Sequence, residues 1–200
     1  MMRLKIVFTL LVFSLIHNCY GQNLSSQLRL SKAGNNFSQT EDDSEDWIDQ
    51  RNAVYVEIFG NGVGILSGNY ERTICSSQNN LFHESIRVGL SLGTSKFNET
   101  TIYGFPIEAN TLVGKMKNHL EIGLGWTPII GTNNLNDTLL PVGYRSNYNY
   151  AFTIRFGYRF VNHNGFLARI APLAEFTQTP PESPVLSLSW NFGLSFGYAF

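Results

Sequence analysis

The chain has 200 residues, enough for one domain with flanking segments. Its 14 Lys and Arg residues nearly balance its 15 Asp and Glu residues, and the formal net charge of −1 excludes a bulk electrostatic attraction to nucleic acid. Charged residues make up 14% of the chain and aromatic residues another 14%, whereas ordinary soluble domains carry about 25% charged residues. This composition favours a protein with a large apolar surface.

The first 21 residues have the pattern of a secretory signal peptide. A basic start at residues 3–5 precedes an apolar run at residues 6–16. Small residues at Cys19 and Gly21 then stand before Gln22, as a cleavage site requires. The pattern predicts export across the inner membrane and removal of residues 1–21.

Two other interpretations of this segment remain open. An uncleaved membrane anchor needs about 20 apolar residues, but this run stops at His17. Lipidation of Cys19 normally requires a small residue just before the cysteine, and Ile16-His17-Asn18 offers none. After cleavage Cys75 would be the only cysteine, so no internal disulfide is expected.

Residues 22–51 are polar and include an acidic run at residues 41–46. They show almost no apolar periodicity, so we expect a flexible periplasmic leader. An alternative is that the acidic run docks onto a partner.

From Ala53 onward the apolar residues recur at every second position, which is the period of a β-strand with two unlike faces. The last segment shows this best. Its bulky residues are Leu186, Leu188, Trp190, Phe192, Leu194, Phe196, Tyr198 and Phe200, and every residue between them is small or polar. The alternation predicts strands at residues 53–59, 63–73, 84–93, 102–113, 118–127, 148–160, 165–176 and 185–200.

The residues between the bulky positions decide which face of these strands meets solvent. In a soluble barrel the apolar face points inward and charged residues coat the outside. Here the minor face holds Gly, Ser, Arg and Glu, and too few charges remain to coat an outer surface. No later stretch reaches the 18 or so apolar residues of a membrane helix, so any membrane span must consist of strands. We therefore predict an all-β fold at residues 52–200, an eight-stranded antiparallel transmembrane β-barrel of the up-and-down type.

Loop lengths test this topology, because periplasmic turns are short and outer loops longer. The connections at residues 114–117 and 161–164 are short, and those at 94–101, 128–147 and 178–184 are longer. Two connections fit less well. The turn at 60–62 is tight for an outer loop, and 75–83 is long for a periplasmic one.

Eight charged residues fall on the minor face and are expected to point into the lumen: Glu57, Glu71, Arg87, Glu121, Arg155, Arg159, Arg169 and Glu175. An eight-stranded barrel has room only for side chains, so these groups should pair in a packed ionic plug; an open pore is the alternative. His83, His119 and His163 are expected in or beside turns. No spacing indicates a metal site, a cofactor or a catalytic constellation.

Several segments, read in order, resemble a family of small outer-membrane β-barrel proteins of Gram-negative bacteria. They include residues 67–72, 120–125, 157–160 and 193–200, and the likeness covers roughly residues 52–200. The resemblance implies an eight-stranded barrel in the outer membrane but no catalytic residues. Phe196, Tyr198 and Phe200 also resemble the carboxy-terminal signal read by the outer-membrane assembly machinery; aromatic residues at the membrane interface would look the same.

We therefore expect a non-enzymatic outer-membrane protein whose role is structural or depends on surface binding. Its expected partners are outer-membrane lipid, the assembly machinery and a possible surface ligand at residues 128–147. Two alternatives remain from the sequence. One is a lipid-modifying barrel enzyme, and the other is a soluble secreted barrel that carries a ligand.

Overall fold

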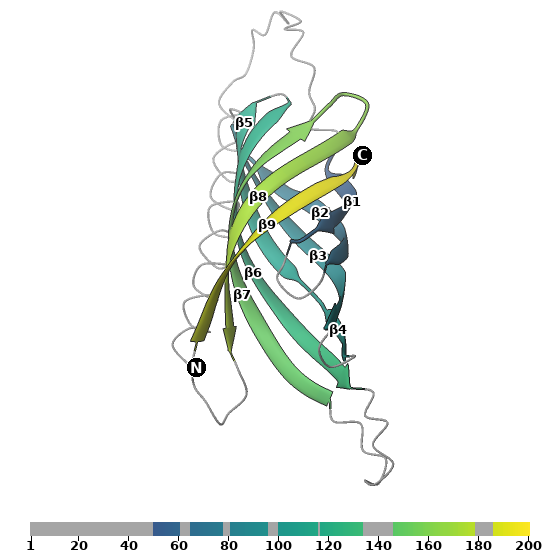
Figure 1. The fold of residues 1–200 in the computed structure, drawn as a ribbon. Helices are drawn as coiled ribbons and strands as arrows, with labels where there is room; N and C mark the ends of the chain where they lie inside the picture. Colours follow the sequence, from purple (N-terminus) through teal and green to yellow (C-terminus); the bar gives the residue numbers. More distant parts are fainter. Residues whose placement is uncertain are drawn as a thin grey trace, which may run out of the picture.

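The computed structural model describes residues 50–60, 65–77, 81–95, 100–115, 117–133, 146–178 and 186–200. All the regular secondary structure of these residues is β-strand, and the strands form a tilted barrel (Figure 1). The expected signal peptide lies outside the described residues, and so does the expected leader apart from its last two positions.

The strands are β1 (Asn52–Ile58), β2 (Leu66–Ser76), β3 (Phe82–Ser95), β4 (Thr100–Gly104), β5 (Ile107–Lys115), β6 (Asn118–Asn133), β7 (Ser146–Val161), β8 (Phe166–Gln178) and β9 (Leu186–Ala199). All pairings are antiparallel, and β1 also pairs with β9, which closes the ring. Both β4 and β5 lie between β3 and β6, so they share one position in the wall. The predicted eight-stranded antiparallel barrel is thus confirmed.

The break between β4 and β5 comes from Pro106, which has no backbone N–H to give to the ladder. The register does not shift across it, because the pairings of Gly104 and Ile107 with β3 and β6 continue the same alignment. Flanking hydrogen bonds also persist: Phe105 N donates to Pro128 O at 3.0 Å, and Gly89 N donates to Pro106 O at 2.9 Å. β4 and β5 therefore act as one strand.

Two hairpins are longer than expected. β6 continues to Asn133 and β7 begins at Ser146, so the loop predicted at 128–147 is partly strand, and residues 134–145 lie outside the described part. Polar and proline residues at the end of β6 suggested a loop, but cross-strand pairing overrides their weak strand preference. The connection predicted at 75–83 is likewise shorter, because β2 ends at Ser76 and β3 starts at Phe82.

The strands are strongly staggered around the ring. Starting at Val54 and moving from partner to partner, the path runs through Tyr70, Val88, Ile107, Trp126, Phe152 and Phe176 to Leu188. The alignment of β9 with β1 would give Leu188 a partner beyond Ile58, where β1 ends, so the path does not return to Val54. Such a displacement requires strands tilted to the barrel axis, as closure of a barrel demands.

The two faces of the wall differ in the predicted sense. Phe192 and Phe196 are 47% and 53% exposed on the outside, whereas Glu121 and Arg155 are fully buried within the ring. Near the end of the barrel where β1 begins and β9 ends, apolar Leu112 and Leu167 and polar residues such as Glu71 line a cavity of about 20 Å³. A space of this size holds about one water molecule. The described residues at this end of the barrel therefore leave little free space in the lumen.

The turn between β7 and β8 yields a test of backbone geometry. Gly165 has φ of 83°, and a Cβ there would lie 2.6 Å from Tyr198 Cε2. We expect Gly165→Ala to lower the free energy of unfolding in micelles by about 1–3 kcal/mol, because alanine is strained at this φ and meets the Tyr198 ring. Urea titration measures the change. Asn164→Ala in the same exposed turn is the control, and an equal effect of both variants would contradict the steric argument.

Candidate functional site

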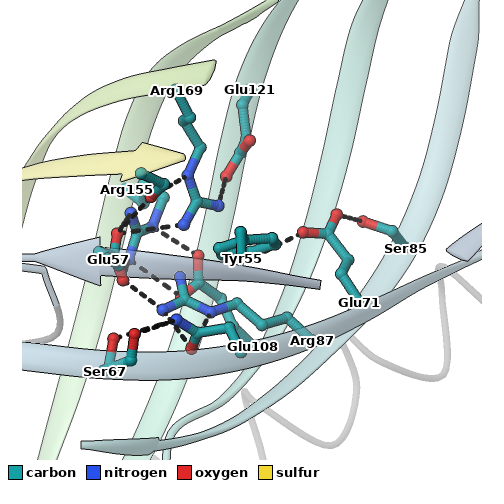
Figure 2. A network of polar contacts seen from close by, with 12 residues as sticks. Tyr55, Glu57, Ser67, Glu71, Ser85, Arg87, Glu108, Glu121, Arg155 and Arg169 are labelled. Carbon is teal, nitrogen blue, oxygen red and sulfur yellow. Dashed lines mark hydrogen bonds and ion pairs between the residues drawn. The ribbon is translucent and has the colours of Figure 1, made fainter. Parts of the chain in front are cut away.

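Four glutamates and four arginines form an ionic network in the barrel lumen. Figure 2 labels all of them except Arg159. The glutamates are Glu57, Glu71, Glu108 and Glu121, and the arginines are Arg87, Arg155, Arg159 and Arg169. Every wall position except β9 contributes at least one of them, and β9 contributes Ser195. All eight charged residues are at most 4% exposed. The network therefore ties the whole circumference together.

Strand alternation explains why these residues meet. Each lies on a strand whose adjacent residues point outward, for example Glu121 between Leu120 and Ile122. Closure then turns all minor faces toward one axis. Glycines at the same level leave room for the long side chains, and a Cβ on Gly123 would lie 2.6 Å from Glu108 Oε1.

Glu57 is the hub of one half of the network. Its carboxylate accepts hydrogen bonds from Arg87, from Arg155 Nη1 at 2.5 Å and from Arg169 Nη2 at 3.1 Å. Glu108 binds two of the same arginines, with Arg155 Nε at 2.7 Å and Arg87 Nη1 at 3.2 Å. Both arginines are thus shared between two carboxylates.

Glu71 and Glu121 form the other half around Arg159. This guanidinium binds Glu71 through two nitrogens, each 2.8 Å from a carboxylate oxygen, and its Nη2 lies 2.7 Å from Glu121 Oε2. Arg169 connects the halves, because its Nη1 lies 2.8 Å from Glu121 Oε1 while its Nη2 reaches Glu57.

Neutral side chains complete the hydrogen bonding. Tyr55 donates its hydroxyl to Glu71 at 2.7 Å, and its ring lies between Arg87 and Arg169, with centroid distances of 5.5 and 4.7 Å to the guanidinium carbons. Asn69 Oδ1 accepts from Arg87 Nε at 3.0 Å. Ser85 donates to Glu71 at 2.5 Å. Cation–π contacts and charge-assisted hydrogen bonds of this kind stabilise charges that water no longer reaches.

The formal charges of the network cancel, four against four. A buried charge without a partner costs several kcal/mol, so this balance is a condition for folding. Each carboxylate accepts bonds from at least two arginines or from one arginine and two hydroxyl groups. The arrangement can hold the strands together and fill the lumen.

Of the eight residues expected in the lumen, the structure joins seven in this network: Glu57, Glu71, Arg87, Glu121, Arg155, Arg159 and Arg169. Glu175 also points inward, but it accepts hydrogen bonds from Thr177 Oγ1 at 3.3 Å and Asn191 Nδ2 at 2.9 Å. Its place as the fourth carboxylate is taken by Glu108, which the sequence reasoning missed. The signal was present, because Glu108 stands between outward-facing Ile107 and Ala109 in a predicted strand.

Two histidines lie beside turns, as expected. His83 and His119 are the second residues of β3 and β6. Both are buried in the lumen, with ring centroids 6.0 Å apart. His163 does lie in the exposed turn between β7 and β8. Among the residues described, no three His, Cys, Asp or Glu side chains gather in a way that could hold a metal ion.

Comparisons with protein-family models, curated proteins and solved structures found no match. The lumen network must therefore be interpreted from its own geometry. In the described part of the chain, no helix is long and apolar enough to span a membrane.

Arg169 allows a sharp test of the network, because it is the link between Glu57 and Glu121. We expect Arg169→Met to lower the free energy of unfolding in micelles by about 3–5 kcal/mol, since both carboxylates lose a buried partner. The matched control is Arg72→Met on the outer face of β2, where the change should stay within about 0.5 kcal/mol. Equal effects of the two variants in denaturant titrations would show that the network does not stabilise the barrel.

Proposed function

We propose that this protein is an integral β-barrel of the Gram-negative outer membrane, with a side-chain-filled lumen and a structural or surface-binding role. The observation that carries the proposal is the inverted polarity of the wall. Large apolar side chains cover the outside on all the wall strands, while the inside holds the charged residues. A soluble barrel has the opposite arrangement, whereas a lipid-facing barrel requires this one.

Two tyrosines near one end of the barrel also support a membrane environment. Tyr70 donates its hydroxyl to Asn52 at 2.8 Å, and Tyr158 donates to Asn118 at 2.5 Å. Both asparagines are the first residues of their strands. Each ring thus covers the apolar wall while its hydroxyl points toward the strand end, which is the arrangement that membrane interfaces favour.

The packed lumen favours a structural role over conduction. Paired charges fill the section between β1 and β8, and the apolar residues around Leu112 and Leu167 lie toward one end. An ion or solute would have to break several buried pairs to pass. The surface ligand expected at residues 128–147 would depend largely on residues 134–145, which lie outside the described residues.

The carboxy-terminal strand fits recognition by the outer-membrane assembly machinery. Phe196, Tyr198 and Phe200 all lie on the outer face and are about half exposed, and the last two rings are stacked with centroids 6.4 Å apart. An assembly factor could therefore read them on the unclosed strand or on its outer side. Export before this step would rely on the predicted signal at residues 1–21.

Cell fractionation and gel mobility test the membrane assignment. We expect the protein to sediment with the outer membrane and to dissolve only in detergent. A closed barrel whose lumen is ion-paired should also migrate faster in unheated samples than in boiled ones, because detergent alone does not unfold it. Recovery in the soluble periplasmic fraction without detergent would refute the proposal.

A pair of matched substitutions tests the lipid-facing surface directly. Phe156 lies in the middle of β7 and is 56% exposed, whereas Phe166 is the first residue of β8 and is 48% exposed. In lipid vesicles we expect Phe156→Arg to cost about 2–4 kcal/mol and Phe166→Arg about 0–1 kcal/mol, because the cost of a charge depends on depth in the bilayer. If both positions face water, the two variants should behave alike.

A further inference from the structure

One half of β9 has an open edge. β9 pairs with β8 from Leu186 to Tyr198, but its pairing with β1 covers only Leu194 to Ala199. The two residues after β1, Phe59 and Gly60, are not part of a strand. Figure 1 shows β1 and β2 beside the carboxy-terminal half of β9. Among the described residues, none pairs with Leu186–Gly193 on this side.

The chain leaves the wall at Phe59. This residue has a positive φ of 56°, and its N–H donates to Ile65 O across the turn at 3.0 Å. Gly60 is buried, and a Cβ built on Gly193 would lie 3.3 Å from Gly60 Cα and 2.7 Å from Glu57 Oε1. The start of the turn therefore lies over Glu57, on the inner side of β9, and does not continue the wall beside it.

Exposure shows the same opening. Trp190 is 73% exposed, more than any other large apolar residue described. Ser187 and Ser189 are exposed as well, although they alternate with the outward-facing residues. At the same end of the barrel, the inward-facing Thr127 and Thr153 are buried. Residues 187–190 of β9 are thus exposed on both faces, and no residue that the structure describes pairs with them on the β1 side.

This edge lacks the features that normally block strand addition. Residues 186–193 contain no charged residue and no proline, and their pairing with β8 has no bulge. An open edge leaves backbone N–H and C=O groups unsatisfied, which is costly in an apolar environment. A second strand beside β9 would remove this cost.

Glu175 adds a charge preference to the edge. It pairs across the sheet with Ser189 and is buried on the inner face, where its hydrogen-bond donors Thr177 and Asn191 are neutral. A strand added next to β9 would place an inward side chain opposite Ser189, two strands from Glu175. A long cationic side chain there can reach this carboxylate.

We propose that β9 accepts an extended segment of a partner polypeptide by antiparallel strand addition along Leu186–Phe192. The segment carries a basic residue opposite Ser189, directed toward Glu175, and apolar residues on the outer side beside Leu188 and Trp190. Main-chain hydrogen bonds supply the affinity of such complexes, and side chains at alternate positions supply the specificity.

A second copy of this chain does not fit the edge if, as proposed above, the barrel spans a membrane. Antiparallel pairing of two identical β9 strands relates the two barrels by a twofold axis perpendicular to the sheet. That operation reverses the barrel axis and would place the copies in opposite orientations across the membrane. The occupant is therefore not β9 of a second copy, and the basic residue that Glu175 favours defines it as a segment of a partner polypeptide.

The probe is the peptide Leu-Ser-Leu-Arg-Leu-Ser-Leu with blocked ends, added to the full-length barrel in detergent micelles. We expect hydrogen exchange of the amides within Leu186–Gly193 that do not bond to β8 to slow by about tenfold or more. The same peptide with glutamate in place of arginine should bind at least about tenfold more weakly, because it brings like charges together. Glu175→Gln should abolish this difference.

Two controls separate strand addition from general adsorption. A peptide with N-methyl groups on alternate residues of its bonding edge should give no protection. Glu84→Gln, which removes a half-buried carboxylate hydrogen-bonded to Thr111 on β5, should leave the preference for arginine unchanged. Absence of protection at saturating peptide, or equal binding of the arginine and glutamate peptides to the unmodified barrel, would overturn the proposal, and neither result would alter the membrane assignment.

Discussion

The pairing of charges inside a space closed to bulk water is the constraint on which this structure depends. A guanidinium or carboxylate in such a space is tolerated only with opposite charges and hydrogen bonds around it. Glu57 meets this condition through three arginines from three different strands. Because the partners lie around the whole ring, the ion pairs can form only when the ring is closed.

Closure and polarity are therefore coupled. The large apolar residues can face outward because the charged residues pair with one another in the lumen. The charged residues can be buried there because the glycines between them leave space for their side chains. Pro106 shows how firmly the ladder is held, since it removes a donor in mid-strand without shifting the register. Arg169 shows the same for the interior, because one side chain bridges both halves of the network.

Period-two alternation was enough to predict the barrel, its number of strands and most inward-facing charges. It works because one strand face is uniformly bulky, so each intervening residue is assigned without ambiguity. Glu108 was missed although the same rule applies to it. Glu175 was assigned to the network because the rule predicts which face of the wall a side chain lies on, but not its height along the barrel axis. The stagger between strands sets the height, and it depends on register, which the sequence shows only indirectly. The ends of β6 and β7 were misjudged because polar strand tips have the composition of loops.

Pairing between β1 and β9 has a consequence for biosynthesis. Asn52 and Phe200 exchange backbone hydrogen bonds of 2.8 and 2.7 Å, so β9 completes the ring that β1 begins. Glu57 is hydrogen-bonded to Arg169, which lies 112 positions later in the sequence. A ribosome-bound or truncated chain would thus carry exposed, uncompensated ions and could not settle into a partial barrel. Closure of the ring for that reason waits for β9, and a chain that lacks β9 would remain open to proteases.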